Sequence, residues 1–201
     1  MRDYARLDVF LDRLQDDLYP DSFGQQNEYI TNQVISSLVE SGHIHSGMNV
    51  LDVGCGIGLA AKKFRDVGCH VVCMDPQSDY LDEVTDDQSF MQCSKELFDL
   101  VWARHVLEHS PMPYFTLTEY WRVLKPGGLC YVEVPAPDTQ AEHESNANHY
   151  SVMGARMWAH LMKRAGFIND QFLKLDFVVK QINGSPDLPD TYFAFLLRKP
   201  K

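Results

Sequence analysis

The segment Val50-Leu51-Asp52-Val53-Gly54-Cys55-Gly56-Ile57-Gly58 decides the fold of this chain. An apolar run ends near an acid, a Gly-x-Gly-x-Gly turn follows, and a helix-like segment continues from Leu59 to Val67. Glycines let the backbone turn tightly and approach a ligand where a Cβ atom would collide. Such a strand–turn–helix unit is typical of open α/β sheets, which bind ligands at the carboxyl ends of their strands.

The spacing of these glycines separates two classes of nucleotide ligand. A dinucleotide fingerprint has the pattern Gly-x-Gly-x-x-Gly, but here the third glycine, Gly58, comes one residue early and Leu59 follows it. This spacing favours a nucleoside-type ligand that has no pyrophosphate.

The rest of the chain alternates between strand-like and helix-like patterns, which predicts a parallel sheet with helices on both faces. An amphipathic helix is expected from Leu7 to Leu18 and a second helix from Gly24 to Glu40. Two strand-like runs near the end, joined by a turn signal at 183–187, predict an antiparallel hairpin. Strands are expected at 48–53, 70–75, 89–93, 98–103, 128–134, 172–181 and 192–198, and further helices at 58–67, 77–84, 113–124 and 152–165.

Composition narrows the class of protein. The 201 residues fit a single domain, and the net charge of −10 opposes non-specific binding to nucleic acid. No apolar run approaches the roughly 20 residues that span a bilayer, and the N-terminus does not resemble a signal peptide. Five cysteines without paired metal spacing are typical of reduced thiols. We therefore expect a cytoplasmic protein that binds neither membranes nor bulk nucleic acid.

Four motifs in order carry a resemblance to a known family. Asp52 to Gly58 resembles the first motif of class I S-adenosylmethionine (SAM) dependent methyltransferases. It is followed by an apolar run that ends at Asp75, by Phe98-Asp99-Leu100-Val101-Trp102-Ala103 running into Val106-Leu107-Glu108-His109, and by Leu124-Lys125-Pro126-Gly127-Gly128. Together these motifs, over about residues 45 to 135, resemble the small-molecule branch of that family (types 11 and 23).

The resemblance implies a Rossmann-like, mostly parallel sheet of seven strands in the order 3-2-1-4-5-7-6. It also implies SAM as the cofactor, S-adenosylhomocysteine (SAH) as the product and a small molecule as the methyl acceptor. Within a single methyltransferase domain over 1–201 we expect an N-terminal helical lid at 1–45, a SAM-binding core at 46–135, and an acceptor side at 136–201. The acceptor atom is left open between oxygen, nitrogen and carbon.

The same resemblance implies roles for individual residues. Asp52 would hold the methionine end of SAM, and Asp75 would accept both ribose hydroxyls, although Asp75 could instead cap the next helix. Relatives carry an acid after strand three that contacts adenine; no acid follows the strand expected at 89–93. The residues expected to line the cofactor are Asp52, Gly54, Cys55, Gly56, Gly58, Asp75, Pro76, Gln77, Cys93, Ser94, Ala103 and Arg104. Gln25, Gln26 and Tyr29 are further candidates for its carboxylate.

Histidines are the candidate catalytic bases, because histidine titrates near neutral pH. His149, ahead of the expected helix at 152–165, and His105, directly after a strand, could each remove a proton from the acceptor; each could equally serve only in packing. For His109 we favour a structural hydrogen bond. Glu142-His143-Glu144 resembles a metal site in composition, but sequence neighbours in a polar loop do not converge on an ion. No metal is therefore expected.

Two alternative functions remain at the level of sequence. The missing acid after strand three suggests a non-catalytic or regulatory module that binds SAM or SAH without turnover. An aminopropyl transferase is the weaker alternative, because Trp102-Ala103-Arg104 offers no acid beside the reacting amine.

Overall fold

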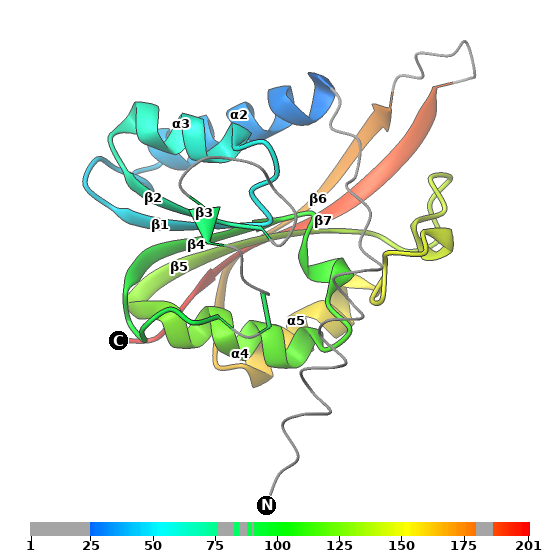
Figure 1. Ribbon diagram of the computed structural model, residues 1–201. Helices are drawn as coiled ribbons and strands as arrows, with labels where there is room; N and C mark the ends of the chain where they lie inside the picture. Colours follow the sequence, from blue (N-terminus) through cyan, green and yellow to red (C-terminus); the bar gives the residue numbers. More distant parts are fainter. Residues whose placement is uncertain (1–24, 76–82, 85–87, 90, 180–186) are drawn as a thin grey trace, which may run out of the picture.

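The computed structural model describes residues 25–75, 83–84, 88–89, 91–179 and 187–201 (Figure 1). The helix expected from Leu7 to Leu18 lies outside these residues, as does most of the turn expected at 183–187.

A seven-stranded sheet forms the centre of the protein, in the order β3-β2-β1-β4-β5-β7-β6. Its strands run parallel except for β7, which is antiparallel to both of its neighbours. This confirms the predicted Rossmann-like order and the final hairpin. The strands are β1 (Asn49–Val53), β2 (His70–Met74), β3 (Glu83–Val84), β4 (Phe98–Arg104), β5 (Leu124–Pro135), β6 (Ile168–Val179) and β7 (Leu188–Arg198).

Helices cover both faces of the sheet, as predicted. In Figure 1, α2 (Gln25–Glu40) and α3 (Leu59–Val67) lie on one face, whereas α4 (Pro113–Val123) and α5 (Ala155–Arg164) lie on the other. Two short 3-10 turns, η1 (Leu107–His109) and η2 (His143–Ser145), occupy the loops that follow β4 and β5. Among the described helices, none combines the length and apolarity needed to cross a membrane.

Each helical layer buries its own hydrophobic core against the sheet. On one face Ile35 of α2 and Phe64 of α3 pack with Trp102 of β4, and on the other Tyr120 of α4 and Trp158 of α5 pack with the inner strands. The Trp102 ring stacks on Tyr131 at 4.3 Å between centroids. The alternation of side chains along β4 thus feeds both cores, as expected for a sheet covered on both faces.

The position of the third strand differs from the prediction. The strand expected at 89–93 is wrong, because β3 is formed by Glu83 and Val84, which pair with Cys73 and Met74. The helix expected at 77–84 is therefore wrong at its last two residues; 77–82 lie outside the described part of the chain.

The segment before β4 follows α4 instead of joining the sheet. The Arg122 guanidinium donates to the carbonyls of Met91 and Cys93, both at 2.8 Å. The N–H groups of Glu96 and Leu97 donate to carbonyls at the end of α4, at 3.0 and 2.8 Å. Because these backbone groups are satisfied by the helix, the segment does not need a strand partner.

Candidate active site

The glycine turn lies between β1 and α3 and is fastened to β2. The N–H groups of Gly54 and Cys55 both donate to the carbonyl of Met74, at 2.7 and 3.2 Å. Gly54, Gly56 and Gly58 have φ values of 67°, 51° and 77°, a region that side chains rarely adopt. A Cβ atom on Gly54 would lie 2.6 Å from Val106 Cγ2, so the turn also packs closely against the segment after β4.

Asp75 directly follows β2, and its side chain is turned toward the glycine turn. The Gly56 N–H donates to Asp75 Oδ2 at 2.9 Å. This hydrogen bond holds Asp75, which is predicted to bind the ribose, beside the glycine turn that is predicted to contact the cofactor. Both lie at the carboxyl ends of β1 and β2.

Asp52 is almost fully buried in β1. Burial raises the pKa of its carboxyl group, and a hydrogen bond from the Ala61 N–H only partly opposes this effect. Its Oδ2 atom has no hydrogen-bond partner among the described residues. Buried polar atoms are normally paired, so an orphaned carboxylate oxygen beside a bare glycine turn fits a cationic or hydrogen-bonding group of a ligand. The carboxyl groups of Asp52 and Asp75, beside the glycine turn, therefore suit SAM.

A buried ion pair follows at the ends of β4 and β5. Arg104 Nε lies 2.9 Å from Glu133 Oε1, and its Nη1 donates to Thr31 Oγ1 of α2 at 3.1 Å. The Tyr131 hydroxyl donates to Glu133 Oε2 at 2.6 Å. Although burial alone would raise it, these partners and His105 lower the pKa of Glu133 to about 2. The network joins α2 to the carboxyl ends of β4 and β5, the end of the sheet where the residues predicted to bind the cofactor lie.

His105 is held between two carboxylates. Its φ is 55°, and its Nε2 atom lies 3.1 Å from Glu133 Oε1, while Nδ1 lies 3.7 Å from Glu108 Oε1. Burial and the charge of Arg104 lower the pKa of His105, but the two carboxylates outweigh them and raise it above its usual value. Because both ring nitrogens face carboxylates, His105 is poorly placed to remove a proton from an acceptor, and this geometry favours a positioning role.

His149 lies in the loop before α5, close to two other histidines. Its Nδ1 atom is 2.8 Å from the His143 carbonyl, and its ring centroid is 4.9 Å from that of His109. Burial lowers the pKa of His149. His109 Nδ1 lies 3.0 Å from the Asn148 carbonyl, which is the kind of structural hydrogen bond expected for it.

Two of the residues expected at the cofactor are not brought to it. The Cys93 carbonyl accepts a hydrogen bond from Arg122. Ser94 follows it in the segment that leads to the start of β4, at the amino end of that strand. Ala103 is fully buried in the core, which leaves only its backbone for a ligand. Pro76 and Gln77 lie outside the described residues, as do the side chains of Gln25 and Gln26, and Tyr29 is exposed.

Several residues at this site were not singled out from the sequence. Glu133 and Glu108 are each 1% exposed, and their burial arises from contacts between separate elements. One signal was available for Glu133, since a single acid interrupts the apolar run of β5. In the tripeptide Glu142-His143-Glu144, His143 Nε2 lies 3.0 Å from Asp190 Oδ1, and Glu144 accepts the Asp138 N–H.

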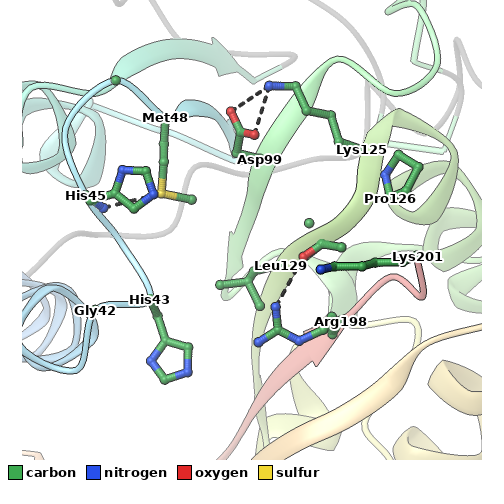
Figure 2. Close-up of a pocket in the computed structure, with 13 residues that line it drawn as sticks. Gly42, His43, His45, Met48, Asp99, Lys125, Pro126, Leu129, Arg198 and Lys201 are labelled. Carbon is green, nitrogen blue, oxygen red and sulfur yellow. Dashed lines mark hydrogen bonds and ion pairs between the residues drawn. The ribbon is translucent and has the colours of Figure 1, made fainter.

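A different cavity opens at the other end of the sheet, shown in Figure 2. Its volume is about 510 Å³. Two of its lining residues form an ion pair, in which Lys125 Nζ donates to both carboxylate oxygens of Asp99 at 2.8 Å. It is lined by Gly42, His43, His45, Gly47, Met48, Asp99, Lys125, Pro126, Gly127, Gly128, Leu129, Arg198 and Lys201. Because these residues surround the amino ends of β1, β4 and β5, the cavity is separate from the cofactor residues.

Comparisons with known proteins identify the family. A family model described as a methyltransferase domain, of type 23, matches residues 25–171. The malonyl-[acyl-carrier protein] O-methyltransferase of Enterobacter lignolyticus is 31% identical over 103 residues, which are 46% of this chain and 41% of that protein. The ubiquinone biosynthesis O-methyltransferase of a Bradyrhizobium species is 34% identical over 100 residues, 43% of this chain and 40% of that protein. The chain thus matches about two fifths of the length of these relatives.

A solved structure shares the fold at low identity. Phosphoethanolamine N-methyltransferase 2 of Haemonchus contortus, in complex with S-adenosyl-L-methionine, superposes with a TM-score of 0.66 at 18% identity, over 85% of this chain and 53% of that chain. Since the family model covers most of the sequence and the four motifs lie within it, the chain belongs to the class I SAM-dependent methyltransferases.

Proposed function

We propose that this protein transfers the methyl group of SAM to an oxygen, nitrogen or carbon atom of a small molecule. The observation that carries the proposal is the pairing of the glycine turn with Asp75, through the 2.9 Å hydrogen bond from Gly56, beside the orphaned oxygen of Asp52. The relatives whose names specify O-methylation support a small or carrier-bound acceptor.

SAM supplies an electrophilic methyl group on a sulfonium, so the protein's part is chiefly to bind and orient the two reactants. Asp75 would bind the ribose hydroxyls and Asp52 would face the methionine end. The backbone of Gly54, Gly56 and Gly58 would pass close to the cofactor, with Cys55 filling the turn from inside. Arg104 would fix the lid helix α2 through Thr31.

The acceptor would lie beside η1 and the loop that leads to α5. A proton on the acceptor needs a base, and His149 suits this role because its lowered pKa keeps it neutral at pH 7. Its Nδ1 proton is engaged by the His143 carbonyl, which leaves Nε2 as the basic nitrogen. His105 would then act as a positioning residue in the Glu133 network.

Titration calorimetry with SAM and SAH tests the proposal directly. The wild type should bind both ligands, and Asp75→Ala should lose most of the affinity because the ribose loses its acceptor. Asp66→Ala, an exposed acid on α3, provides the matched control and should bind as the wild type does. Absence of binding by a folded wild type would refute the proposal.

The alternative is a non-catalytic module that binds SAH. It was suggested by a missing acid after strand three, and the position of β3 weakens that argument. The absence of an acid after strand three was inferred for a strand at 89–93. With β3 at Glu83–Val84, the residues that follow it in the sequence are Thr85, Asp86 and Asp87, so acids do follow the strand. Cofactor binding without product across a broad panel of acceptors would favour the alternative.

A further inference from the structure

The turn after β4 and the loop before α5 bring three metal-ligating side chains together. One donor atom each from Glu108, His109 and His149 lies within 4.8 Å of the other two. Glu108 is 1% exposed, and its Oε2 atom has no hydrogen-bond partner among the described residues. Buried polar atoms are normally hydrogen-bonded, so a buried carboxylate oxygen without a described partner is a candidate ligand for an ion.

Backbone hydrogen bonds fix the tautomer of both imidazoles. His109 Nδ1 lies 3.0 Å from the Asn148 carbonyl, and His149 Nδ1 lies 2.8 Å from the His143 carbonyl. A carbonyl only accepts, so each neutral ring carries its proton on Nδ1 and its lone pair on Nε2. Histidines that bind metals are usually held in this manner, with the second nitrogen bonded to a carbonyl or carboxylate.

The loop that carries His149 is attached directly to η1. The N–H groups of Tyr150 and Ser151 both donate to the Glu108 carbonyl, at 2.9 and 3.1 Å. The three donors are therefore held near one another by the backbone. The Asn146 amide lies 3.3 Å from His149 Nε2, a long hydrogen bond that a bound ion would replace.

We propose that Glu108, His109 and His149 form a binding site for a divalent transition-metal ion of the Zn²⁺ class. Two imidazoles and one carboxylate are a ligand set that zinc and its neighbours accept, with at least one further position open.

The site lies next to the cofactor turn, because Val106, which precedes η1, is the residue that a side chain on Gly54 would strike. An ion there could take an oxygen atom of the acceptor in its open position, and this part of the inference rests on the proposed function. As a ligand through Nε2, His149 could not also remove a proton with that nitrogen. The two roles exclude each other, and metal titration decides between them.

The test uses the full chain, freed of metal with EDTA and titrated with Co²⁺ by calorimetry and visible absorption. We expect one ion per chain and a spectrum without thiolate bands, which separates this site from the five cysteines. Loss of groups that merely orient metal ligands costs about 10–100-fold in affinity. His149→Ala and Glu108→Gln should therefore weaken binding at least about tenfold, whereas His160→Ala, an exposed histidine on α5, should not.

His149→Ala alters only a half-buried loop residue, so it keeps the test decisive if Glu108→Gln fails to fold. A wild type that binds no Co²⁺, or a folded His149→Ala that binds it as the wild type does, would overturn the site. SAH binding should be the same in His149→Ala as in the wild type, so failure of the proposed function appears separately as loss of SAH binding. Turnover that persists after complete removal of metal would overturn only the role at the acceptor.

Discussion

At the scale of single residues, the buried acid Asp52 is a predicted cofactor residue whose burial works against stability. Its carboxyl has a raised pKa because of burial and an oxygen without a described partner. A raised pKa in the folded state means that this group destabilises the fold as the pH rises above the unfolded value. Under the proposed function, a bound cofactor would supply the partner that this carboxyl group lacks.

Asp52→Asn should therefore separate stability from binding. Asparagine keeps an oxygen for the Ala61 N–H but removes the charge, so the unliganded variant should be as stable as the wild type at pH 7, or more so. Its affinity for SAH should fall by about tenfold, the scale of one charged hydrogen bond. Thermal unfolding with and without SAH measures both, with Asp66→Asn as the control. A variant that is less stable yet binds normally would assign Asp52 to the fold alone.

Glu133 shows the opposite behaviour, because its charge is fully paired. Its pKa of about 2 in the folded state lies below the ordinary value, so its stabilising effect is complete above about pH 4.5 and is lost as the pH falls toward 2. Glu133→Gln leaves the buried Arg104 without its counter-ion, which should cost about 3 kcal/mol at pH 7.

Urea unfolding of wild type and Glu133→Gln between pH 7 and pH 3 measures this effect. The gap between the two unfolding free energies should narrow below about pH 4.5, because Glu133 of the unfolded wild type then takes up a proton more readily than Glu133 of the folded protein. Asp66→Asn should show no comparable gap. A difference that stays constant down to pH 3 would mean that the Glu133 charge does not stabilise the fold.

The sequence identified the local part of the candidate site but not its tertiary part. Asp52, Asp75 and the three glycines could be located because they belong to short motifs whose chemistry follows from spacing. The pairing of Glu108 and Glu133 through His105 could not be located in this way, since it depends on how β4, β5 and η1 meet. The convergence of His149 on Glu108 joins residues that are far apart in the sequence, and no local pattern reports it.

At the scale of elements, the third strand shows where local patterns fail. The run at 89–93 has strand-like composition, yet Arg122 takes the carbonyls of Met91 and Cys93, and β3 is only two residues long. Strands β1, β2 and β4 were located to within one residue because each is a largely apolar run with clear boundaries. Strand β5 begins at Leu124, four residues before the predicted start, so its predicted turn signal at 126–128 lies inside the strand. An edge strand with two residues offers too little sequence for such a pattern.

The turn between β1 and α3 should be intolerant of any side chain at Gly54. Gly54→Ala combines a φ of +67° with a Cβ atom 2.6 Å from Val106. Strain in this conformation costs about 1–2 kcal/mol, and overpacking adds about 1–3 kcal/mol. Gly42→Ala, with a φ of +76° and nothing within 4 Å, carries only the first cost and is the matched control.

Urea unfolding of these variants separates strain from packing. Gly54→Ala should be clearly less stable than Gly42→Ala, and adding Val106→Ala to Gly54→Ala should recover part of the difference by removing the clashing methyl groups. Equal losses in the two glycine variants would contradict the close packing of the turn against the segment after β4.

At the scale of the whole molecule, the two ends of the sheet carry different sets of residues. The carboxyl ends of the parallel strands carry the acids and histidines of the candidate site, and the amino ends carry the cavity of Figure 2. Local stability should follow burial across the sheet. Most of β4 and β5 is buried, whereas β6 is an edge strand with Phe172 and Leu173 exposed.

Hydrogen exchange measured by mass spectrometry tests both points in one experiment. Without ligand, amides of β4 and β5 should exchange most slowly and those of β6 faster, because exposed edges open at lower free energy. Adding SAH should slow exchange in the glycine turn at 54–58 and at 104–109, and leave residues 42–48 beside the other cavity unchanged. Protection that appears at 42–48 instead would place the ligand at the amino ends of the strands, and would refute the polarity that the acids and glycines imply.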